Sequence, residues 1–502
     1  MSNTDQAPSL YAAREPIFPK RVSGKFRSLK WVIMIVTLGI YYVTPWIRWD
    51  RGDKLPDQAV LIDLANRRFF MFWIEIWPHE FYFVAGLLIM AGLGLFLFTA
   101  ALGRVWCGYT CPQTVWTDLF ILVERWIEGD RNNRIRLLRQ KWNFRKARLR
   151  VTKWTAWFLI AVATGGAWVF YFADAPTLLV DLVTFQAPKV AYATVGLLTA
   201  TTFIFGGFMR EQVCIYMCPW PRIQAAMMDE DTITVAYRDW RGEPRGKHRK
   251  AHAKVAAETH TADHIQQKEA PTDVPQMGDC IDCNACVNVC PMGIDIRDGQ
   301  QLECITCALC IDACDEIMDK IGKPRGLIDY MALTDEEHEK SGEPRIPVWK
   351  HVFRIRTLIY TFLWAAIGVG LVVALFVRQD ISVTVAPIRN PIFVTMSDGS
   401  IRNAYDVRIR NQNGEDRIFE ITEASEAHLN VVVEGSDNQQ VLVDADTTKL
   451  TRVYLVADKD SDAAQEARTD VWLWITDLSS GDQAGKDTVF NGREAKGGAA
   501  NR

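Results

Sequence analysis

Cysteine and charge are each missing from long parts of this 502-residue chain. No cysteine precedes Cys107 and none follows Cys314, and twelve in this length are too sparse for a disulfide-rich secreted scaffold. Their spaced groups are typical of metal ligands rather than disulfides. The chain also lacks a phosphate-binding glycine loop, a nucleophile elbow and a dinucleotide fingerprint. A formal net charge of −3 gives no reason to expect nucleic acid as a partner.

Charged residues are absent from five runs, and a membrane-spanning helix needs about 20 apolar residues. Trp, Tyr and Arg flank these runs, so we prefer five spans to buried core helices of a soluble protein. The first run starts too late for a signal peptide and lacks its cleavage site. The runs are residues 31–47, 81–103, 154–173, 190–209 and 357–377.

Lys and Arg counts predict which segments face the cytoplasm. Residues 1–30 carry 6 basic against 2 acidic residues, and residues 104–153 carry 12 against 4. The positive-inside rule therefore places both segments inside, and five spans place residues 210–356 there as well. All cysteines then lie on the reducing side, and the C-terminal segment lies outside. We expect the basic segment 131–153 to contact membrane lipid rather than nucleic acid.

The strongest motif is a doubled cysteine run with the spacing C-x2-C-x2-C-x3-C. It comprises Cys280, Cys283, Cys286 and Cys290, then Cys304, Cys307, Cys310 and Cys314. In bacterial ferredoxins, each three-cysteine loop binds one [4Fe–4S] cluster and the fourth cysteine ligates the other. We therefore expect cluster 1 on Cys280, Cys283, Cys286 and Cys314, and cluster 2 on Cys304, Cys307, Cys310 and Cys290. Asp315 replaces the proline that would follow the second run. Zinc, the alternative, does not call for this spacing twice.

The C-terminal segment alternates short apolar strands with turn-rich clusters, as in residues 381–385, 405–410, 428–433 and 471–475. About seven strands over roughly 110 residues predict an immunoglobulin-like sandwich. The expected fold class is a multi-domain membrane protein with a five-span α-helical domain, a two-cluster ferredoxin-like α+β domain and an all-β immunoglobulin-like domain. The expected segments are a cytoplasmic N-terminal tail (1–30), a membrane domain with four spans (31–240), a linker (241–272), a ferredoxin-type domain (273–335), a connector (336–356), the fifth span (357–377), an exported β domain (378–480) and a disordered tail (481–502).

A smaller motif, Cys-x-Tyr-x-Cys-Pro, occurs twice, at residues 107–112 and 214–219. Each copy follows a predicted span, so an internal repeat would bring Cys107, Cys111, Cys214 and Cys218 together at the membrane edge. Residues four apart share a helix face, so each pair can offer two thiolates to one soft ion. Thiolate and thioether favour Cu(I), and Met209 and Met217 lie nearby in the sequence. We prefer a copper site. A metal-free redox dithiol and inert buried cysteines are the alternatives.

These motifs resemble the CcoG/FixG/RdxA family of cytochrome c oxidase accessory proteins of bacterial inner membranes. The resemblance rests on residues 104–118, 214–224, 237–245 and 278–330, and it covers nearly the full chain. It implies reduction of Cu(II) to Cu(I) for the copper centre of a C-type (cbb-type) cytochrome c oxidase. The implied partners are that oxidase and its copper chaperones. The implied catalytic site is the four paired cysteines, with the clusters and the N-terminus cytoplasmic and the C-terminal domain periplasmic.

A membrane ferredoxin of the NapH type, which oxidises quinol and passes electrons to a partner protein, is the alternative function. It shares four spans, Cys-x3-Cys-Pro repeats and two clusters, but the fifth span and the exported β domain favour the accessory protein. A non-catalytic scaffold would not need two clusters. The sequence leaves open the electron donor, a homodimer, and any metal binding by the linker histidines, which are His248, His252, His260 and His264.

Overall fold

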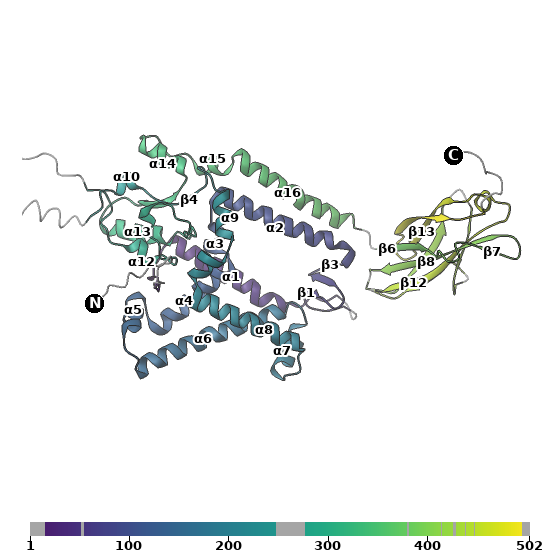
Figure 1. Ribbon diagram of the computed structural model, residues 1–502, viewed down its shortest axis with the longest axis horizontal. Coiled ribbons are helices and arrows are strands. Elements are labelled where there is room, and N and C mark those ends of the chain that lie inside the picture. The colour runs from purple at the N-terminus through teal and green to yellow at the C-terminus, as the bar shows by residue number, and fades with distance from the viewer. Residues whose placement is uncertain are drawn as a thin grey trace, which may run out of the picture. The chain divides into compact units, whose positions relative to one another are not determined.

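The computed structural model describes residues 16–51, 55–246, 277–378, 381–412, 414–424, 428–436, 438–445 and 447–493. It forms two compact units, residues 1–47 with 58–369 and residues 48–57 with 370–502. We describe each unit by itself (Figure 1). The four linker histidines lie outside the described residues.

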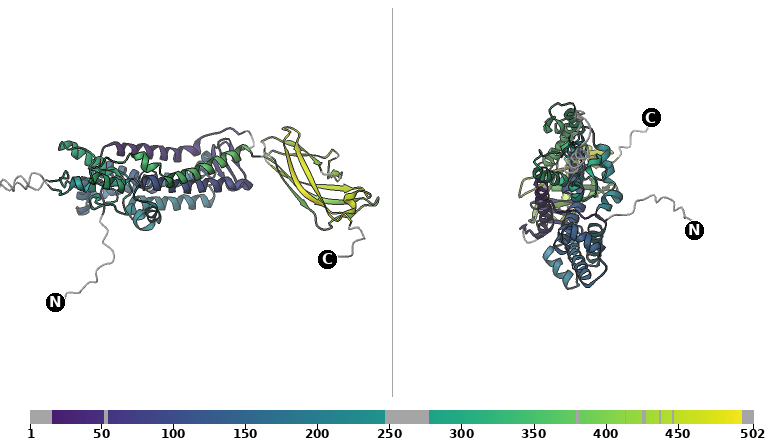
Figure 2. Two further views of the ribbon diagram at one scale, coloured as in Figure 1. Left: turned by 90° about the horizontal axis from the view of Figure 1, so that it is seen from above. Right: turned by 90° about the vertical axis from the view of Figure 1, so that its left-hand side faces the viewer.

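Long apolar helices form the frame of the first unit. Four helical segments are long and apolar enough to cross a membrane, namely residues 25–46, 81–102, 189–209 and 355–376. They confirm four of the five predicted runs as candidate spans and correspond to α1 (Lys25–Val43) with η1 (Thr44–Trp46), α2 (Phe81–Leu102), α8 (Lys189–Thr202) with the π-helical η3 (Phe203–Met209), and α16 (Ile355–Phe376). The left view of Figure 2 shows the long helices of this unit running in nearly the same direction.

The remaining run lies in helix α6 (Phe144–Val169), whose first turns are basic. Its apolar half packs closely against α8, because a Cβ added to Gly165 would lie 2.8 Å from the carbonyl oxygen of Val195. Glycine also allows close packing between α2 and α16, since a Cβ on Gly94 would lie 3.2 Å from the indole nitrogen of Trp364. Helix α6 therefore belongs to the same bundle, while the total of five spans stays a prediction.

Buried ion pairs hold the short connecting helices onto this bundle. Helix α4 (Pro112–Glu128) carries Asp118, which pairs with Arg27 of α1 at 2.8 Å. It also carries Glu124, which pairs with Arg134 at 2.6 Å and with Lys153 at 3.2 Å. Two cations of the basic segment 131–153 thus face acidic groups of the protein, while the lipid contact of its exposed cations stays a prediction.

The cysteine-rich part of this unit combines short helices with a two-stranded sheet. Strand β4 (Thr234–Tyr237) pairs antiparallel with β5 (Ile328–Met331), so the sheet joins segments on either side of residues 247–276. The helices here are α12 (Ala285–Val289), η5 (Ile296–Asp298), α13 (Leu309–Lys320), α14 (Leu333–Lys340) and α15 (Val348–Val352). The other described elements of the first unit are β1 (Val60–Asp63), β2 (Arg68–Met71), β3 (Ile74–Ile76), η2 (Pro78–Glu80), α3 (Val105–Tyr109), α5 (Arg131–Arg139), α7 (Ala175–Val183), η4 (Val213–Met217), α9 (Trp220–Met227) and α10 (Asp239–Gly242).

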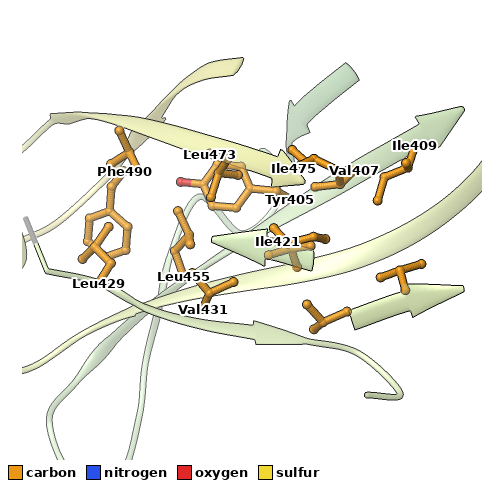
Figure 3. Packing of buried hydrophobic residues seen from close by; sticks show 14 of the residues in the cluster. Tyr405, Val407, Ile409, Ile421, Leu429, Val431, Leu455, Leu473, Ile475 and Phe490 are labelled. Atoms are coloured by element: carbon orange, nitrogen blue, oxygen red, sulfur yellow. The ribbon is translucent and has the colours of Figure 1, made fainter. Parts of the chain in front are cut away.

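The second unit is a sandwich of two antiparallel sheets. The sheet orders are β10-β12-β8-β6, with β7 also on β8, and β11-β9-β13-β14. Inward side chains of both sheets, among them Tyr405, Ile421 and Leu473, form one fully buried core (Figure 3). The immunoglobulin-like prediction is confirmed. The strands are β6 (Ile381–Pro387), β7 (Val394–Thr395), β8 (Ile401–Asn411), β9 (Arg417–Glu423), β10 (Asn430–Val433), β11 (Gln440–Val443), β12 (Thr448–Ala457), β13 (Thr469–Asp477) and β14 (Gln483–Phe490), with helix α17 (Asp462–Gln465) before β13.

The predicted disordered tail, residues 481–502, is wrong for its first half. Strand β14 pairs along its length with β13, and Phe490 is fully buried in the core. The Tyr405 hydroxyl also donates to the Val489 carbonyl at 2.7 Å, which ties the two sheets together. The composition did not predict this strand, because its outward residues include glycine and charged side chains, which are weak strand formers.

Reporter fusions should decide the number of spans and the orientation. A reporter after Arg378 should be active only if it works outside the cytoplasm, and one near residue 260 should behave as cytoplasmic, because the predicted five spans would place the two ends of the chain on opposite sides. A third fusion at Gln186, after α6, should also report the outside. If the fusions at Gln186 and Arg378 both behave as cytoplasmic, α6 does not cross the membrane.

Candidate functional site

The two ferredoxin-type loops share one unusual backbone conformation. Asp282 and Asn284 in the first loop, and Thr306 and Ala308 in the second, occupy the same positions relative to the cysteines and all have φ between 52° and 60°. Residues other than glycine rarely adopt this left-handed region, and they concentrate at binding sites when they do. Such turns direct backbone N–H groups toward one centre, where they can donate to an anionic cluster.

The first group of thiols contains a cysteine from each run. Cys280, Cys286 and Cys314 share one buried cluster of side chains, while Cys283 is exposed. Burial and, to a smaller extent, the neighbouring thiols of Cys286, Cys283 and Cys280 raise the pKa of Cys314 to about 12. The structure therefore brings together the four residues that cluster 1 requires.

The second group is assembled in the same way. Cys290, Cys304, Cys307 and Cys310 line one small cavity. Burial and the thiols of Cys307 and Cys304 raise the pKa of Cys290 to about 12, and burial also raises that of Cys310 well above its usual value.

Helix α13 connects the two groups, because it begins at Leu309 and contains both Cys310 and Cys314. A proline at position 315 would interrupt this helix, whereas Asp315 continues it and accepts from the Gly326 N–H at 3.0 Å. The departure from the ferredoxin pattern therefore stabilises the local fold without removing a ligand.

The donor sets fit two [4Fe–4S] clusters. Each has four thiols, and the pKa values of Cys314 and Cys290, which are raised to about 12, would fall when iron binds the thiolates. Among the described residues no three His, Cys, Asp or Glu side chains converge on a single metal ion. A cubane does not need that convergence, since its ligands bind separate corners. Bound clusters would supply one-electron transfer. The ligand assignment itself stays a prediction.

The four paired cysteines line a separate cavity of about 240 Å³. Cys107 lies in α3 and Cys214 in η4, but Cys111 and Cys218 lie just beyond the ends of these helices, so neither pair occupies one continuous helix. The reason is the proline that ends each motif, which disfavours helical backbone at the residue before it. The two motifs are nevertheless brought to one place.

The thioether that lines this cavity is Met292, two residues after Cys290. Met217 is exposed, and neither it nor Met209 lines the cavity. Met292 and Ile305 also line the cavity of the second thiol group, so the two cavities share these side chains as a wall. Sequence reasoning missed Met292 because only the fold brings it to the paired cysteines.

Arg104 lies between the paired cysteines and the second thiol group. It is buried, donates to the carbonyls of Leu302 and Cys304, and lines the 240 Å³ cavity. Within the described chain, its Nε and Nη2 have no hydrogen-bond partner. Burial raises the pKa of Cys107 and of Cys214 to about 12, and the nearby Arg104 guanidinium opposes both shifts. The arginine therefore favours the thiolate forms.

Gln224 orients one thiol of the cavity. The Cys107 thiol donates to its side-chain carbonyl at 3.1 Å, and the Gln224 amide donates to the Thr99 hydroxyl at 3.3 Å. Gln224 is fully buried on α9, directly after the second motif. The sequence did not predict a role for Arg104 or Gln224, although both lie in residues 104–118 and 214–224, on which the family resemblance rests.

The first motif touches the second ferredoxin loop. A Cβ added to Gly108 would lie 2.6 Å from the Ile305 carbonyl oxygen and 3.2 Å from the Cys307 nitrogen. The neighbouring Tyr109 hydroxyl donates to the Cys307 carbonyl at 3.2 Å. A side chain at position 108 would therefore force the motif and the loop apart. The glycine allows two redox-competent cysteine groups to pack backbone to backbone.

Comparisons with known proteins agree with this arrangement. Family models match residues 209–333 as a 4Fe-4S dicluster domain, residues 83–145 as a 4Fe-4S binding domain, and residues 371–493 as an IG-like fold at the C-terminus of FixG. Protein RdxB of Cereibacter sphaeroides is 67% identical over 97% of this chain and 98% of its own length. The chain belongs to the CcoG/FixG/RdxA family.

Two further relatives extend this family comparison. Protein RdxA of the same organism is 61% identical over 96% of this chain and 98% of its own length. Nitrogen fixation protein FixG of Rhizobium meliloti is 52% identical over 96% of this chain and 94% of its own length. A crystal structure of a FixG-related protein from Vibrio parahaemolyticus aligns with 23% of this chain and 100% of its own, at 16% identity and a TM-score of 0.21, which is too low to bear on the fold. The family member described here is an iron–sulfur electron-transfer protein with several membrane-competent helices.

Anaerobically purified protein should contain about eight iron and eight sulfide atoms per chain, because two four-thiol groups are present. Cys290→Ser and Cys307→Ser should leave the same residual electron paramagnetic resonance spectrum, and Cys314→Ser should instead match Cys283→Ser. Stoichiometric zinc would contradict the clusters. About twelve iron atoms would show that the paired cysteines hold a third cluster, as the 4Fe-4S match over residues 83–145 allows.

Proposed function

We propose that this protein is a membrane-bound iron–sulfur cupric reductase. It reduces Cu(II) to Cu(I) for maturation of the copper centre of a C-type (cbb-type) cytochrome c oxidase. The observation that carries this proposal is the cavity that Cys107, Cys111, Cys214 and Cys218 share, next to the second ferredoxin loop.

The chemistry of the cavity suits copper as a substrate. Thiolate and thioether are soft donors that favour Cu(I) over Cu(II), so binding by the four cysteines and Met292 stabilises the reduced product. The four thiols line a cavity, and no three of the described side chains already converge on one ion as in a closed tetrahedral structural site.

Charge balance also favours this role. Several thiolates around one copper ion leave a net negative charge in a partly buried cavity, and such charge is costly without a counter-ion. The Arg104 guanidinium supplies it from the wall of the cavity and has two donor nitrogens without a partner in the described structure. Its other donor nitrogen holds the loop of the second thiol group through the Cys304 carbonyl at 3.0 Å.

The cellular setting of this function follows from the family and from the charge pattern. We place the N-terminus and both thiol groups in the cytoplasm and the immunoglobulin-like unit in the periplasm of a bacterial inner membrane. The oxidase and its copper chaperones are the proposed partners. This placement keeps the reactive thiols in the reducing compartment.

Copper reduction should require the paired cysteines, whereas cluster assembly should not. Protein reduced with dithionite and freed of excess reductant should convert about two Cu(II) to Cu(I) per chain, because it would hold two one-electron carriers. A variant with serine at positions 107, 111, 214 and 218 should keep its iron yet react with Cu(II) at least about tenfold more slowly, since the ion is no longer held near the loop. A Cu(I)-specific chelator and the recovery of cluster absorbance follow the reaction.

Met217→Ser is the matched control for the fourfold variant, because Met217 is exposed and does not line the cavity. It should react like the unchanged protein. A fourfold variant with the wild-type rate would show that the motifs are not the site of reduction. If that variant kept copper reduction but lost electron transfer to a partner protein, the NapH-like function would replace the one proposed here.

Cu(I) affinity should rise with pH. The thiols of Cys107 and Cys214, whose pKa values are raised to about 12, are protonated at neutral pH and must lose a proton to bind the ion. Affinity should therefore increase by about tenfold per pH unit for each thiol that ionises. Arg104→Met should lower the affinity at every pH, and Arg104→Lys should restore part of it. Competition with a chromophoric chelator between pH 6 and pH 8 measures the slope, and a flat profile would contradict the assignment.

A further inference from the structure

A second cavity of the first unit lies apart from the paired cysteines. It has a volume of about 480 Å³ and lies where the cluster-side ends of α1 and α2 meet α3, β5 and the residues before α15. Its walls are almost entirely apolar, with Leu29, Ile33, Phe98 and Leu102 contributed by the two candidate spans. This volume is within the range of typical small-molecule sites, which is roughly 300–1,000 Å³.

The cavity has an apolar, exposed rim and a polar inner end. Leu29 and Phe98 lie on candidate spans and are 48% and 50% exposed. The rim that they form therefore faces the expected position of the lipid. At the inner end, the Tyr330 hydroxyl donates to the Thr306 carbonyl at 2.9 Å and lies 3.4 Å from the Tyr109 hydroxyl. The cavity therefore suits a molecule with an apolar body and a polar head that would meet the two tyrosines.

The polar end is directly beside the redox groups. Tyr109 donates to the Cys307 carbonyl at 3.2 Å, so the two hydroxyls rest on the loop of the second thiol group. Trp106 lines both this cavity and the cavity of the paired cysteines, which makes it a shared wall. Arg345 also lines the cavity and pairs with Asp329 at 3.2 Å, so a charged pair borders the same end.

We infer that this cavity binds a membrane quinol, which is the electron donor of the protein. The inference rests on the proposed function, since copper reduction needs a reductant that the chain itself does not contain. A quinol has the required form, an apolar tail and a ring with hydroxyl groups, one of which can donate to the adjacent Tyr109 or Tyr330 oxygen. In the overall reaction one quinol gives up two electrons and two protons and becomes a quinone. Two Cu(II) ions take the electrons and become Cu(I), and the two protons leave to solvent.

Two measurements test the site on the full-length protein in lipid nanodiscs. The first is anaerobic reduction of the clusters and of Cu(II) by a short-tailed ubiquinol. The second is photolabelling by an azido-substituted ubiquinone, with the modified peptides identified by mass spectrometry. Ubiquinol should produce about two Cu(I) per quinol consumed, because each copper ion takes one electron. The label should fall on residues from the ends of α1, α2 and α3.

Ile33→Trp fills the cavity with a larger side chain, and Val105→Trp does so from α3. In either variant quinol-driven Cu(I) formation and photolabelling should fall by about tenfold or more, because a packed site does not accommodate the added volume. Cu(I) formation by dithionite-reduced protein should be unchanged. Leu88→Trp is the matched control, since Leu88 is exposed on α2 away from the cavity, and it should behave as wild type.

The outcomes separate this inference from the proposed function. If reduced protein converts Cu(II) but the azido-ubiquinone does not label the cavity and ubiquinol does not drive the reaction, the quinol site is wrong and the cupric reductase stands. If the azido-ubiquinone labels the cavity and ubiquinol reduces the clusters but no Cu(I) forms, the quinol site stands and the copper function is wrong. Displacement of the label by phospholipid alone, with quinol-driven reduction unaffected by both tryptophan variants, would identify the cavity as a lipid site and overturn the inference.

Discussion

The contact between the first paired-cysteine motif and the second ferredoxin loop is the constraint on which the rest of the site depends. Gly108 lies against the backbone of Ile305 and Cys307 so closely that no side chain fits between them. Tyr109 and Arg104 then fix the loop by donating to its carbonyl groups. Because these contacts involve backbone atoms, they define the separation of the two cysteine groups more firmly than side-chain packing alone would.

The neighbouring cavities take their positions from this contact. The cavity of the paired cysteines shares Met292 and Ile305 with the cavity of the second thiol group, and it shares Trp106 with the larger apolar cavity. The cavity of the paired cysteines would therefore be separated by single side chains from the apolar cavity on one side and from the second thiol group on the other. Such a sequence of sites suits electron transfer, because no domain motion is needed to bring the groups together.

Buried charges are compensated differently on helix α4 and at the paired cysteines. On α4 the buried carboxylates of Asp118 and Glu124 are matched by several cations, which neutralises them and connects the helices. The positive charges around Glu124 hold the pKa of its carboxyl at about 2, against the opposing effect of burial. At the paired cysteines the balance is reversed, since Arg104 is a buried cation whose nearby partners are mainly thiols. It is compensated fully only when thiolates are present.

The sequence by itself determined the chemistry of the protein, and the tertiary structure decided how that chemistry is arranged. Cysteine spacing, four apolar runs and the alternation of the β domain were readable because they depend on residues close in the chain. Strand β14, the inward ion pairs of Arg134 and Lys153, and the role of Met292 were not, because each depends on a partner far away in the sequence. The spacing of the paired motifs also predicted a helix for each pair, but the proline that ends each motif breaks the helix at Cys111 and Cys218. Local pattern therefore reports which groups are present, and only long-range packing brings Gly108 and Cys307 into contact.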